Sequence, residues 1–290
     1  MILGAIEAGG TKFVCAVADE QFNVTERITI KTTDPETTMT QVVDFFKQYE
    51  TDLAGIGIGS FGPIDAKTTS LTYGHITSTP KLKWRNFDFL NFLKGYFDIP
   101  MTFTSDVNAS AVGEFHSVEN QEVESLVYYT VGTGIGGGAV QKGELIGGQG
   151  FTEMGHQLIK RHSDDDYEGT CPYHGDCLEG LAAGPAILGR YEIEGKDLAE
   201  DHAYWEILAY YLAQCAVNTT QFYTPDKIIF GGGVMKQEHL FPKIREQFKA
   251  LNQDYMAVGD LECYITGPSL GDDAAVLGCL EMIKAALSDA

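Results

Sequence analysis

The chain has 290 residues, of which 44% are hydrophobic and 21% charged, a composition typical of a globular protein with a sizeable core. Its 41 acidic and 20 basic residues give a formal net charge of −21, so the surface should repel nucleic acid phosphates and anionic membranes. The N-terminal sequence has neither a basic region nor a long apolar stretch, and we therefore expect no signal peptide, no membrane span and a cytoplasmic location.

The first part of the chain is predicted to open with a β-hairpin and to continue with alternating strands and helices. Residues 2–20 alternate small and apolar side chains around a Gly9-Gly10 break, which indicates two strands joined by a glycine tip. Further strands are expected over 23–31, 53–60 and 99–105, and helices over 36–49 and 86–97. The segment DVNASAVGEF then begins another helix, with Ser105 or Asp106 as its cap.

The same plan restarts in the second part of the chain. Residues 124–145, ESLVYYTVGTGIGGGAVQKGEL, again indicate strand, glycine-rich tip and strand, with a turn at Lys142-Gly143 into a further strand. A long helix is expected over about 197–222, and DKIIFGGGV should run from a strand through a glycine turn into a helix. A terminal helix is expected over about 272–288.

Two unequal copies of one plan indicate an α/β protein of two domains, 1–118 and 119–290. We place the boundary in the polar stretch at 118–123, and the terminal helix could pack back on the first domain. Two facing glycine-tipped hairpins would form an interdomain cleft whose walls are backbone N–H groups.

Three glycine-rich loops are candidates for phosphate binding, at 8–12, 132–138 and 231–234. Without a Cβ, phosphate oxygens can approach the backbone closely, and left-handed geometry lets successive N–H groups converge on an anion. We expect the third loop to open a helix, whose positive end also favours phosphate. The second loop fits G-x-G-x-x-G, but the alternating sequence after it predicts a hairpin rather than the helix of a dinucleotide-binding fold. No P-loop motif occurs.

Asp106 has two readings that are compatible with each other. It heads a helix, where aspartate is a favoured cap. It also stands at the end of a strand beside the expected cleft, where a carboxylate could take a proton from a hydroxyl that attacks phosphorus. Asn108 would lie one turn inside the same helix, able to hydrogen-bond neighbouring hydroxyls.

A dense group of soft ligands lies in CPYHGDC, which holds Cys171, His174 and Cys177, with His156 fifteen residues upstream of the first cysteine. Thiolate and imidazole are the ligands that tetrahedral zinc prefers, so a structural zinc knuckle is favoured, and His162 competes as the fourth ligand. A Cys171–Cys177 disulfide is sterically possible but disfavoured in the cytoplasm. The intervening polar segment 160–169 would be mobile without such a clip. The other cysteines are interpreted as core residues, namely Cys15, Cys215, Cys263 and Cys279.

The order AGGTK, DVNA, GTGIGGG, E-x-G-H, Cys/His motif and GGGV resembles the ROK family of sugar kinases over essentially the whole chain. Within that family, IEAGGTKFVCAV, SFGPID, HITSTPKLKW and CLEGLAAGPAI are similar to the bacterial fructokinase branch. The resemblance implies an actin-like ATPase (ribonuclease H-like) fold, with MgATP and a hexose between the two domains and a zinc-binding loop at 153–180. The expected reaction is phosphorylation of D-fructose at its 6-hydroxyl.

The resemblance also assigns roles to individual residues. Asp106 matches the catalytic base. The sugar contacts are Asn108, Glu153, His156 and Glu179, and the zinc ligands are His156, Cys171, His174 and Cys177. The nucleotide contacts are Gly9, Gly10, Thr11, Lys12, Thr133, Gly134, Pro185, Gly231, Gly232, Gly233, Val234 and Met235.

Two departures from the common family pattern stand out. Glu7 replaces the usual aspartate of the first phosphate loop, so its part in Mg²⁺ binding stays open, and a histidine replaces one of three cysteines in the zinc motif. A glucokinase, mannokinase or N-acetylmannosamine kinase of the same family is the alternative activity, and a non-catalytic sugar-sensing protein is the alternative class. Relatives often dimerise, so a homodimer is expected, whereas nucleic acid binding is not.

Overall fold

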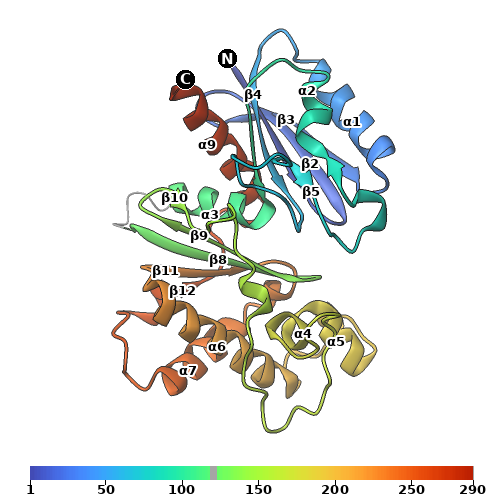
Figure 1. Cartoon of the computed structure of the whole chain (residues 1–290). Coiled ribbons are helices and arrows are strands. Elements are labelled where there is room, and N and C mark those ends of the chain that lie inside the picture. Colours follow the sequence, from blue (N-terminus) through green and yellow to red (C-terminus); the bar gives the residue numbers. More distant parts are fainter. Residues whose placement is uncertain (118–122, 290) are drawn as a thin grey trace. The chain divides into compact units, whose positions relative to one another are not determined.

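The computed structural model describes residues 1–117 and 123–289, and the boundary expected at 118–123 therefore falls almost wholly outside the described residues (Figure 1). The chain divides into two compact units. The first unit comprises Met1–Glu119, Leu145–Phe151 and Leu270–Ala290, and the second comprises Asn120–Glu144 and Thr152–Ser269. The chain therefore passes from the second unit into the first for residues 145–151 and again at residue 270. Within the described ranges, no helix is long and apolar enough to cross a membrane.

The sheet of the first unit has the strand order β3-β2-β1-β4-β7. Its strands are β1 (Ile2–Ala8), β2 (Lys12–Ala18), β3 (Val24–Lys31), β4 (Leu53–Ser60) and β7 (Met101–Ser105). The first three are antiparallel neighbours, as the hairpin pattern predicts, whereas β4 and β7 continue the sheet in parallel from β1. A further two-stranded sheet pairs β5 (His75–Ile76) with β6 (Phe87–Asp88).

Both faces of the first sheet are buried, because the side chains of β1 and β2 alternate between two clusters. One cluster is rich in aromatic rings, with Trp84 only 5.4 Å from Phe13 between ring centroids, and it packs against α1 (Pro35–Lys47) and α2 (Phe89–Lys94). The other cluster contains small residues and α9 (Ala274–Ser288), which also packs on α3 (Asp106–Ser117) (Figure 1).

The contact between α3 and α9 depends on two glycines, which have no side chain. A Cβ at Gly278 would lie 1.8 Å from the carbonyl oxygen of Ala109, and one at Gly113 would lie 2.1 Å from that of Ala274. Neither glycine has a positive φ, so the need for glycine here comes from close helix approach and not from backbone conformation.

Gly278→Ala should therefore lower the free energy of unfolding by about 1–3 kcal/mol, the usual cost of overpacking. The loss should appear although alanine is the better helix former by about 1 kcal/mol. Urea denaturation measures it as a lower midpoint with an unchanged slope. Gly148→Ala is the matched control, because a Cβ there meets no atom within 4 Å. Equal midpoints for the two variants would contradict the packing argument.

The second unit repeats the plan of the first, with strand order β10-β9-β8-β11-β12. Its strands are β8 (Ser125–Val131), β9 (Ile135–Gln141), β10 (Glu144–Leu145), β11 (Lys227–Gly231) and β12 (Ile265–Thr266). Strands β8 and β9 form an antiparallel hairpin, while β11 and β12 extend the sheet in parallel from β8. The repeat inferred from the sequence is thus present at the level of sheet topology. The helices are α4 (Leu178–Ala182), α5 (Gly184–Tyr191), α6 (Tyr204–Tyr223), α7 (Leu240–Asn252) and α8 (Leu261–Tyr264).

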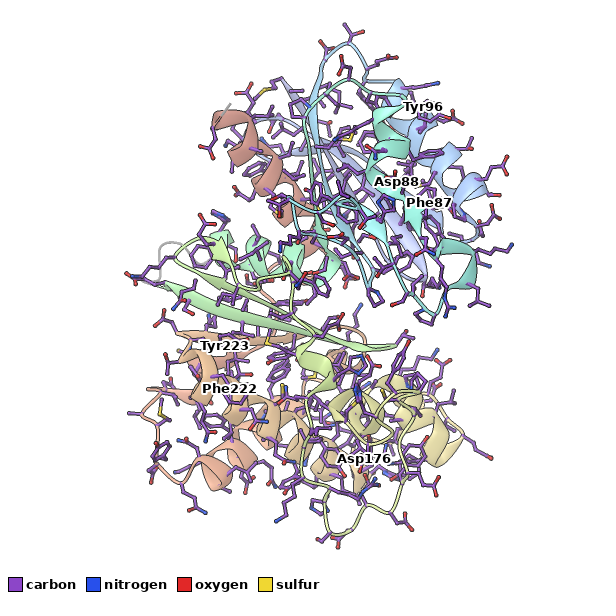
Figure 2. All side chains as sticks on the ribbon, in the orientation of Figure 1. Phe87, Asp88, Tyr96, Asp176, Phe222 and Tyr223 are labelled. Atoms are coloured by element: carbon purple, nitrogen blue, oxygen red, sulfur yellow. The ribbon has the colours of Figure 1, made fainter. Side chains whose placement is uncertain are left out.

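Three expected elements differ from the structure. The long helix begins at Tyr204 and not near 197, since the His202 ring accepts a hydrogen bond from the Tyr204 N–H, 3.1 Å away. Only Phe89–Lys94 of the segment 86–97 is helical, because the Asp88 side chain caps it through the Asn91 N–H (3.1 Å). Phe87 and Asp88 form β6, and Tyr96 lies beyond the helix end (Figure 2).

The third difference lies in the GGGV loop, where the sequence predicts the direct start of a helix. Gly232 has a φ of +92°, and only a 3₁₀ turn of three residues follows, at Val234–Lys236. The α-helix α7 begins at Leu240. A helix dipole therefore does not act at this loop, and an anion there would be bound by the N–H groups of the turn alone.

Candidate active site

The first glycine loop is the tight turn between β1 and β2. The Gly9 N–H donates to the Lys12 carbonyl at 3.0 Å, and the hydroxyl of Thr32 donates to the Gly9 carbonyl at 2.8 Å. Thr11 and Lys12 are exposed on this turn. A Cβ at Gly10 would lie 3.1 Å from Cε of Lys81, so a second lysine stands beside the loop. This residue is not predicted from the sequence. Its position eighty-one residues into the chain gave no local signal, although it lies in the HITSTPKLKW stretch.

Asp106 is the first residue of α3 and follows β7 directly. The cap of this helix is Ser105, whose hydroxyl accepts the Asn108 N–H at 3.2 Å. The half-buried carboxylate of Asp106 accepts the adjacent Val107 N–H at 2.9 Å. Since Ser105 serves as the cap, capping does not account for the aspartate.

Asn108 is fully buried in the first unit. Its amide nitrogen donates to the Thr104 hydroxyl at 3.0 Å and to the Gly150 carbonyl at 2.9 Å. Its Oδ1 is buried and has no hydrogen-bond partner in the described part of the chain. The side chain therefore ties the segment 145–151 to α3, and only Oδ1 is left to accept a bond from a ligand.

In the second unit, the glycine turns that contain Gly132, Gly184 and Gly233 converge at the carboxyl ends of β8 and β11. The Gly184 N–H at the start of α5 donates to the Gly132 carbonyl at 2.7 Å, and a Cβ at Gly132 would lie 3.8 Å from the nitrogen of Gly233. Thr133 is exposed at the tip of the hairpin, and Pro185 follows Gly184. These turns lie where parallel α/β sheets bind ligands, outside the carboxyl ends of the strands.

The backbone of the three glycine loops 8–12, 132–138 and 231–234 differs from the left-handed geometry expected. Of the glycines in the three loops, only Gly232 has a positive φ, so the left-handed conformation expected for successive N–H groups is absent from 8–12 and 132–138. Val234 and Met235, expected to contact nucleotide, are buried. Gly233 leaves open space, since no atom lies within 4 Å of a Cβ there, whereas a Cβ at Gly231 or Gly232 would lie within 2.6 Å of another atom.

Glu179, on α4, links the hairpin tip to His156. Its Oε2 accepts the Ile135 N–H at 2.9 Å, and a Cβ at Gly134 would lie 2.7 Å from this same oxygen. Gly134 is therefore needed to make room for a carboxylate of the protein. The other oxygen, Oε1, lies 3.8 Å from Nε2 of His156. Desolvation raises the pKa of the nearby Glu153 carboxyl; His156 lowers this pKa electrostatically, while Glu179 raises it.

The four expected metal ligands come together. Their donor atoms, in His156, Cys171, His174 and Cys177, all lie within 4.8 Å of one another. Sulfur–nitrogen distances are 3.6 Å (Cys171 to His156), 3.7 Å (Cys171 to His174) and 3.5 Å (Cys177 to His156). A zinc tetrahedron with ordinary Zn–S and Zn–N bonds has a sulfur–nitrogen edge of about 3.6 Å, so the residues fit zinc. His156 would use Nδ1, which leaves Nε2 facing Glu179.

The competing interpretations of this loop do not agree with the structure. Cys171 and Cys177 are free thiols, and His162 is not part of the group because its Nδ1 accepts the Asp164 N–H at 3.1 Å. Cys15, Cys215 and Cys279 are buried as expected, whereas Cys263 is exposed, so the core interpretation is wrong for that residue. It lies in the short helix α8, which is too brief for a periodic pattern to reveal which side faces solvent.

The repeated five-stranded sheets, each led by a glycine-tipped hairpin, define a protein of the actin-like ATPase fold. The solved ROK hexokinase of Thermus thermophilus superposes with a TM-score of 0.81, at 23% identity over 100% of both chains. A model of the ROK family matches residues 3–286, and the chain belongs to this family. A fructokinase of Streptococcus mutans is 50% identical over 98% of this chain and 97% of its own. A fructokinase of Lactococcus lactis is 49% identical over 95% of this chain and 94% of its own.

Proposed function

We propose that the protein is an ATP-dependent fructokinase, which transfers the γ-phosphoryl group of ATP to the 6-hydroxyl of D-fructose. The observation that carries the proposal is the similarity to curated fructokinases at about half identity over nearly the full length of both chains. It is supported by the position of Asp106 directly after β7, where Ser105 and not Asp106 caps the helix α3.

In the proposed reaction, Asp106 accepts the proton of the 6-hydroxyl while the oxygen forms a bond to the γ-phosphorus and the bond from that phosphorus to the β-phosphate oxygen breaks. ADP leaves with the electron pair of the broken bond. Backbone N–H groups of the glycine turns, Lys12 and Mg²⁺ would stabilise the charge on the transferring group. Lys81, beside Gly10, is a further cation for the same phosphates.

The remaining roles are proposals of the same kind. Asn108, Glu153, His156 and Glu179 would hold the sugar hydroxyls, with Asn108 offering only Oδ1. The nucleotide would contact residues 9–12, Thr133, Gly134, Pro185 and residues 231–235. Zinc would organise the loop that carries His156 and would take no part in the chemistry. Burial raises the pKa of the Glu7 carboxyl, although Lys12 and Arg27 lower it.

A cytoplasmic homodimer is also proposed, from the family resemblance and from free thiols that suit a reducing compartment. The aromatic stretch at 203–214 does not supply the dimer contact in this picture, because Tyr204, Trp205 and Tyr211 are buried within the second unit. Light scattering coupled to size-exclusion chromatography tests the dimer.

A panel of sugars with ATP, followed by release of ADP, tests the activity. We expect the highest kcat/KM with D-fructose and lower values with glucose, mannose and N-acetylmannosamine. A clear preference for another hexose would refute the assignment as a fructokinase, although the protein would still be a sugar kinase. Sugar binding by calorimetry without ADP release from any sugar would instead support a sensing protein. Omission of Mg²⁺ is the control, since turnover should then stop.

A further inference from the structure

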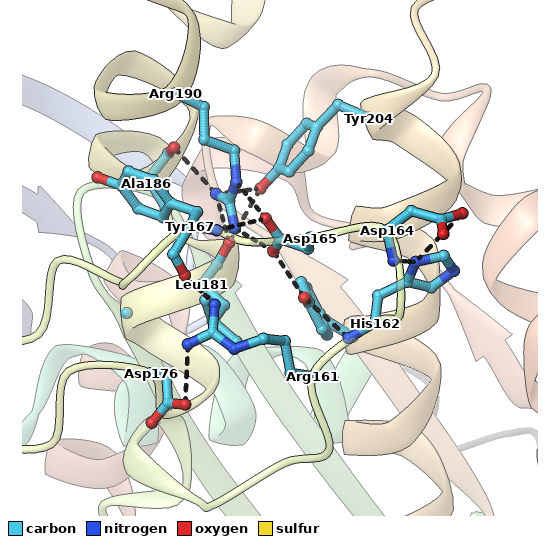
Figure 3. Close-up of polar contacts among 12 residues, drawn as sticks. Arg161, His162, Asp164, Asp165, Tyr167, Asp176, Leu181, Ala186, Arg190 and Tyr204 are labelled. Atoms are coloured by element: carbon cyan, nitrogen blue, oxygen red, sulfur yellow. Dashed lines mark hydrogen bonds and ion pairs between the residues drawn. The ribbon is translucent and has the colours of Figure 1, made fainter.

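A buried ion pair holds the loop between the metal ligands. Asp165, in the polar segment 160–169, and Arg190, on α5, have side chains that are only 4% and 6% exposed. Two hydrogen bonds join them, from Nε to Oδ1 at 3.2 Å and from Nη2 to Oδ2 at 2.6 Å (Figure 3). Burial would raise the pKa of Asp165, but the bonds from Arg190 and Tyr211 outweigh it and lower this pKa. The pair is therefore a bidentate, ionised contact.

The other side of the guanidinium reaches α4, the helix that bears Glu179. Nη1 of Arg190 donates to the Leu181 carbonyl at 2.9 Å, and the Tyr204 hydroxyl donates to the same carbonyl at 3.0 Å. The guanidinium carbon lies 4.3 Å and 4.7 Å from the ring centroids of Tyr167 and Tyr204, which sandwich it (Figure 3). Since α4 follows Cys177 directly, Arg190 joins the loop to an element that presents a metal ligand and Glu179.

The first part of the loop, 157–165, follows one face of α6. Its partners on α6 are spaced three or four residues apart, as neighbours on one helix face are. Asn218 donates to Gln157 (2.8 Å), Gln214 exchanges two bonds of 2.9 Å with the backbone of Lys160, and the Tyr211 hydroxyl accepts the His162 N–H (3.1 Å) and donates to Asp165 (2.6 Å). Side chains of α6 thus anchor 157–165, whereas the composition of 160–169 predicts mobility in the absence of a metal.

The knuckle at 171–176 is attached differently. Its backbone hydrogen bonds close a turn within itself, from Cys171 N–H to the Gly175 carbonyl (3.2 Å) and back from Gly175 N–H (2.9 Å). Its side-chain tie to the rest of the loop is the pair of Asp176 with Arg161, which are 50% and 32% exposed. Gly180 of α4 also lies against the knuckle, since a Cβ there would be 1.9 Å from the Gly175 carbonyl oxygen. Exposed ion pairs contribute little to stability, so we expect the Asp176–Arg161 pair to hold the knuckle less firmly than the buried pair holds residues 157–165.

We propose that Arg190 and Asp165 are a positioning pair that preorganises half of the metal site. They keep His156 and Cys177 in place for the metal, and Glu179 against the Ile135 N–H, before the metal binds, while Cys171 and His174 close over it afterwards. The sugar-binding part of this proposal rests on the proposed function, but the metal-binding part does not.

Hydrogen exchange on the zinc-free wild-type protein tests the division of the loop. Amides of 157–165 should stay protected after chelation, whereas amides of 171–176 should exchange at least about 10-fold faster than in the zinc-loaded protein. Loss of protection in both segments together would overturn the proposal, and so would retained protection in both. This measurement needs no variant and no activity.

Arg190→Met tests the pair itself, and Arg161→Met is the matched control because Arg161 serves the same loop through an exposed partner. In Arg190→Met, zinc should pass to a chromophoric chelator at least about 10-fold faster, the scale seen when residues that orient metal ligands are lost. The sugar KM should rise while the ATP KM stays constant. A variant that is only partly folded would have a smaller active fraction and hence a lower kcat, but its sugar KM and ATP KM would both stay unchanged.

Arg190→Lys replaces Arg190→Met as the test if Arg190→Met does not fold, since lysine keeps the charge but loses the bidentate geometry. It should show the same split to a smaller extent. Unchanged zinc release and sugar KM in both variants would overturn the proposal. Wild-type protein with no kinase activity would refute the proposed function instead, and zinc release would still decide the role of the pair.

Discussion

Asp106→Asn should lower kcat with fructose and ATP by ~10²-fold or more, the scale that general-base catalysis supplies. Asparagine keeps the size of the side chain and its acceptor for the Val107 N–H, but it cannot take the proton of the attacking hydroxyl. We therefore expect the fold and the affinity for ATP to be retained. Initial rates by ADP release, together with nucleotide binding by calorimetry, measure both quantities.

Ser105→Ala is the control for this variant, because it removes the side chain that caps α3 and leaves the carboxylate in place. It should cost about 1 kcal/mol of stability and change kcat only a few-fold. Should Asp106→Asn turn over like the wild type while Ser105→Ala is destabilised, the carboxylate would have no catalytic task and the proposed mechanism would fail.

Removal of the metal is expected to have the second largest effect. Purified protein should contain about one zinc per chain, since four donors meet at distances that suit one tetrahedral ion. Chelation, or Cys177→Ser, should raise the sugar KM by about 10–100-fold and leave the ATP KM little changed. The reason is that His156, although its loop stays in place, loses the metal bond at Nδ1 that fixes its ring with Nε2 toward Glu179.

Cys263→Ser is the matched control for the cysteine substitution, because this thiol is exposed and lies outside the metal group. Zinc content and both KM values should equal those of the wild type. Active protein that is free of zinc and has a normal sugar KM would confine the four residues to a role unrelated to substrate binding.

Local sequence determined the elements whose causes lie within a few residues. The two glycine-tipped hairpins, the buried strand at 53–60 and the start of α3 after Ser105 are formed as predicted, since alternation, turn residues and caps act between near neighbours. The metal group was predictable for a chemical reason, because Cys and His at such spacing favour one kind of ion.

The resemblance to a family supplied the positions that no local pattern reveals. Glu179 and Pro185 carry no signal of their own, and only the order of motifs along the chain indicated them. The structure adds why Glu179 faces the hairpin tip: Gly134 leaves room for its carboxylate, and the Ile135 N–H binds it.

Tertiary structure alone decided the features that depend on partners far away in the chain. The buried Asn108 donates to the Gly150 carbonyl forty-two residues later, and Lys81 stands beside Gly10 because separate segments pack together. The segment 160–169 looks mobile by composition, yet Arg190 and the polar face of α6 hold it. A polar residue is placed by whichever distant group satisfies its hydrogen bonds, and such pairings arise only when the chain has folded.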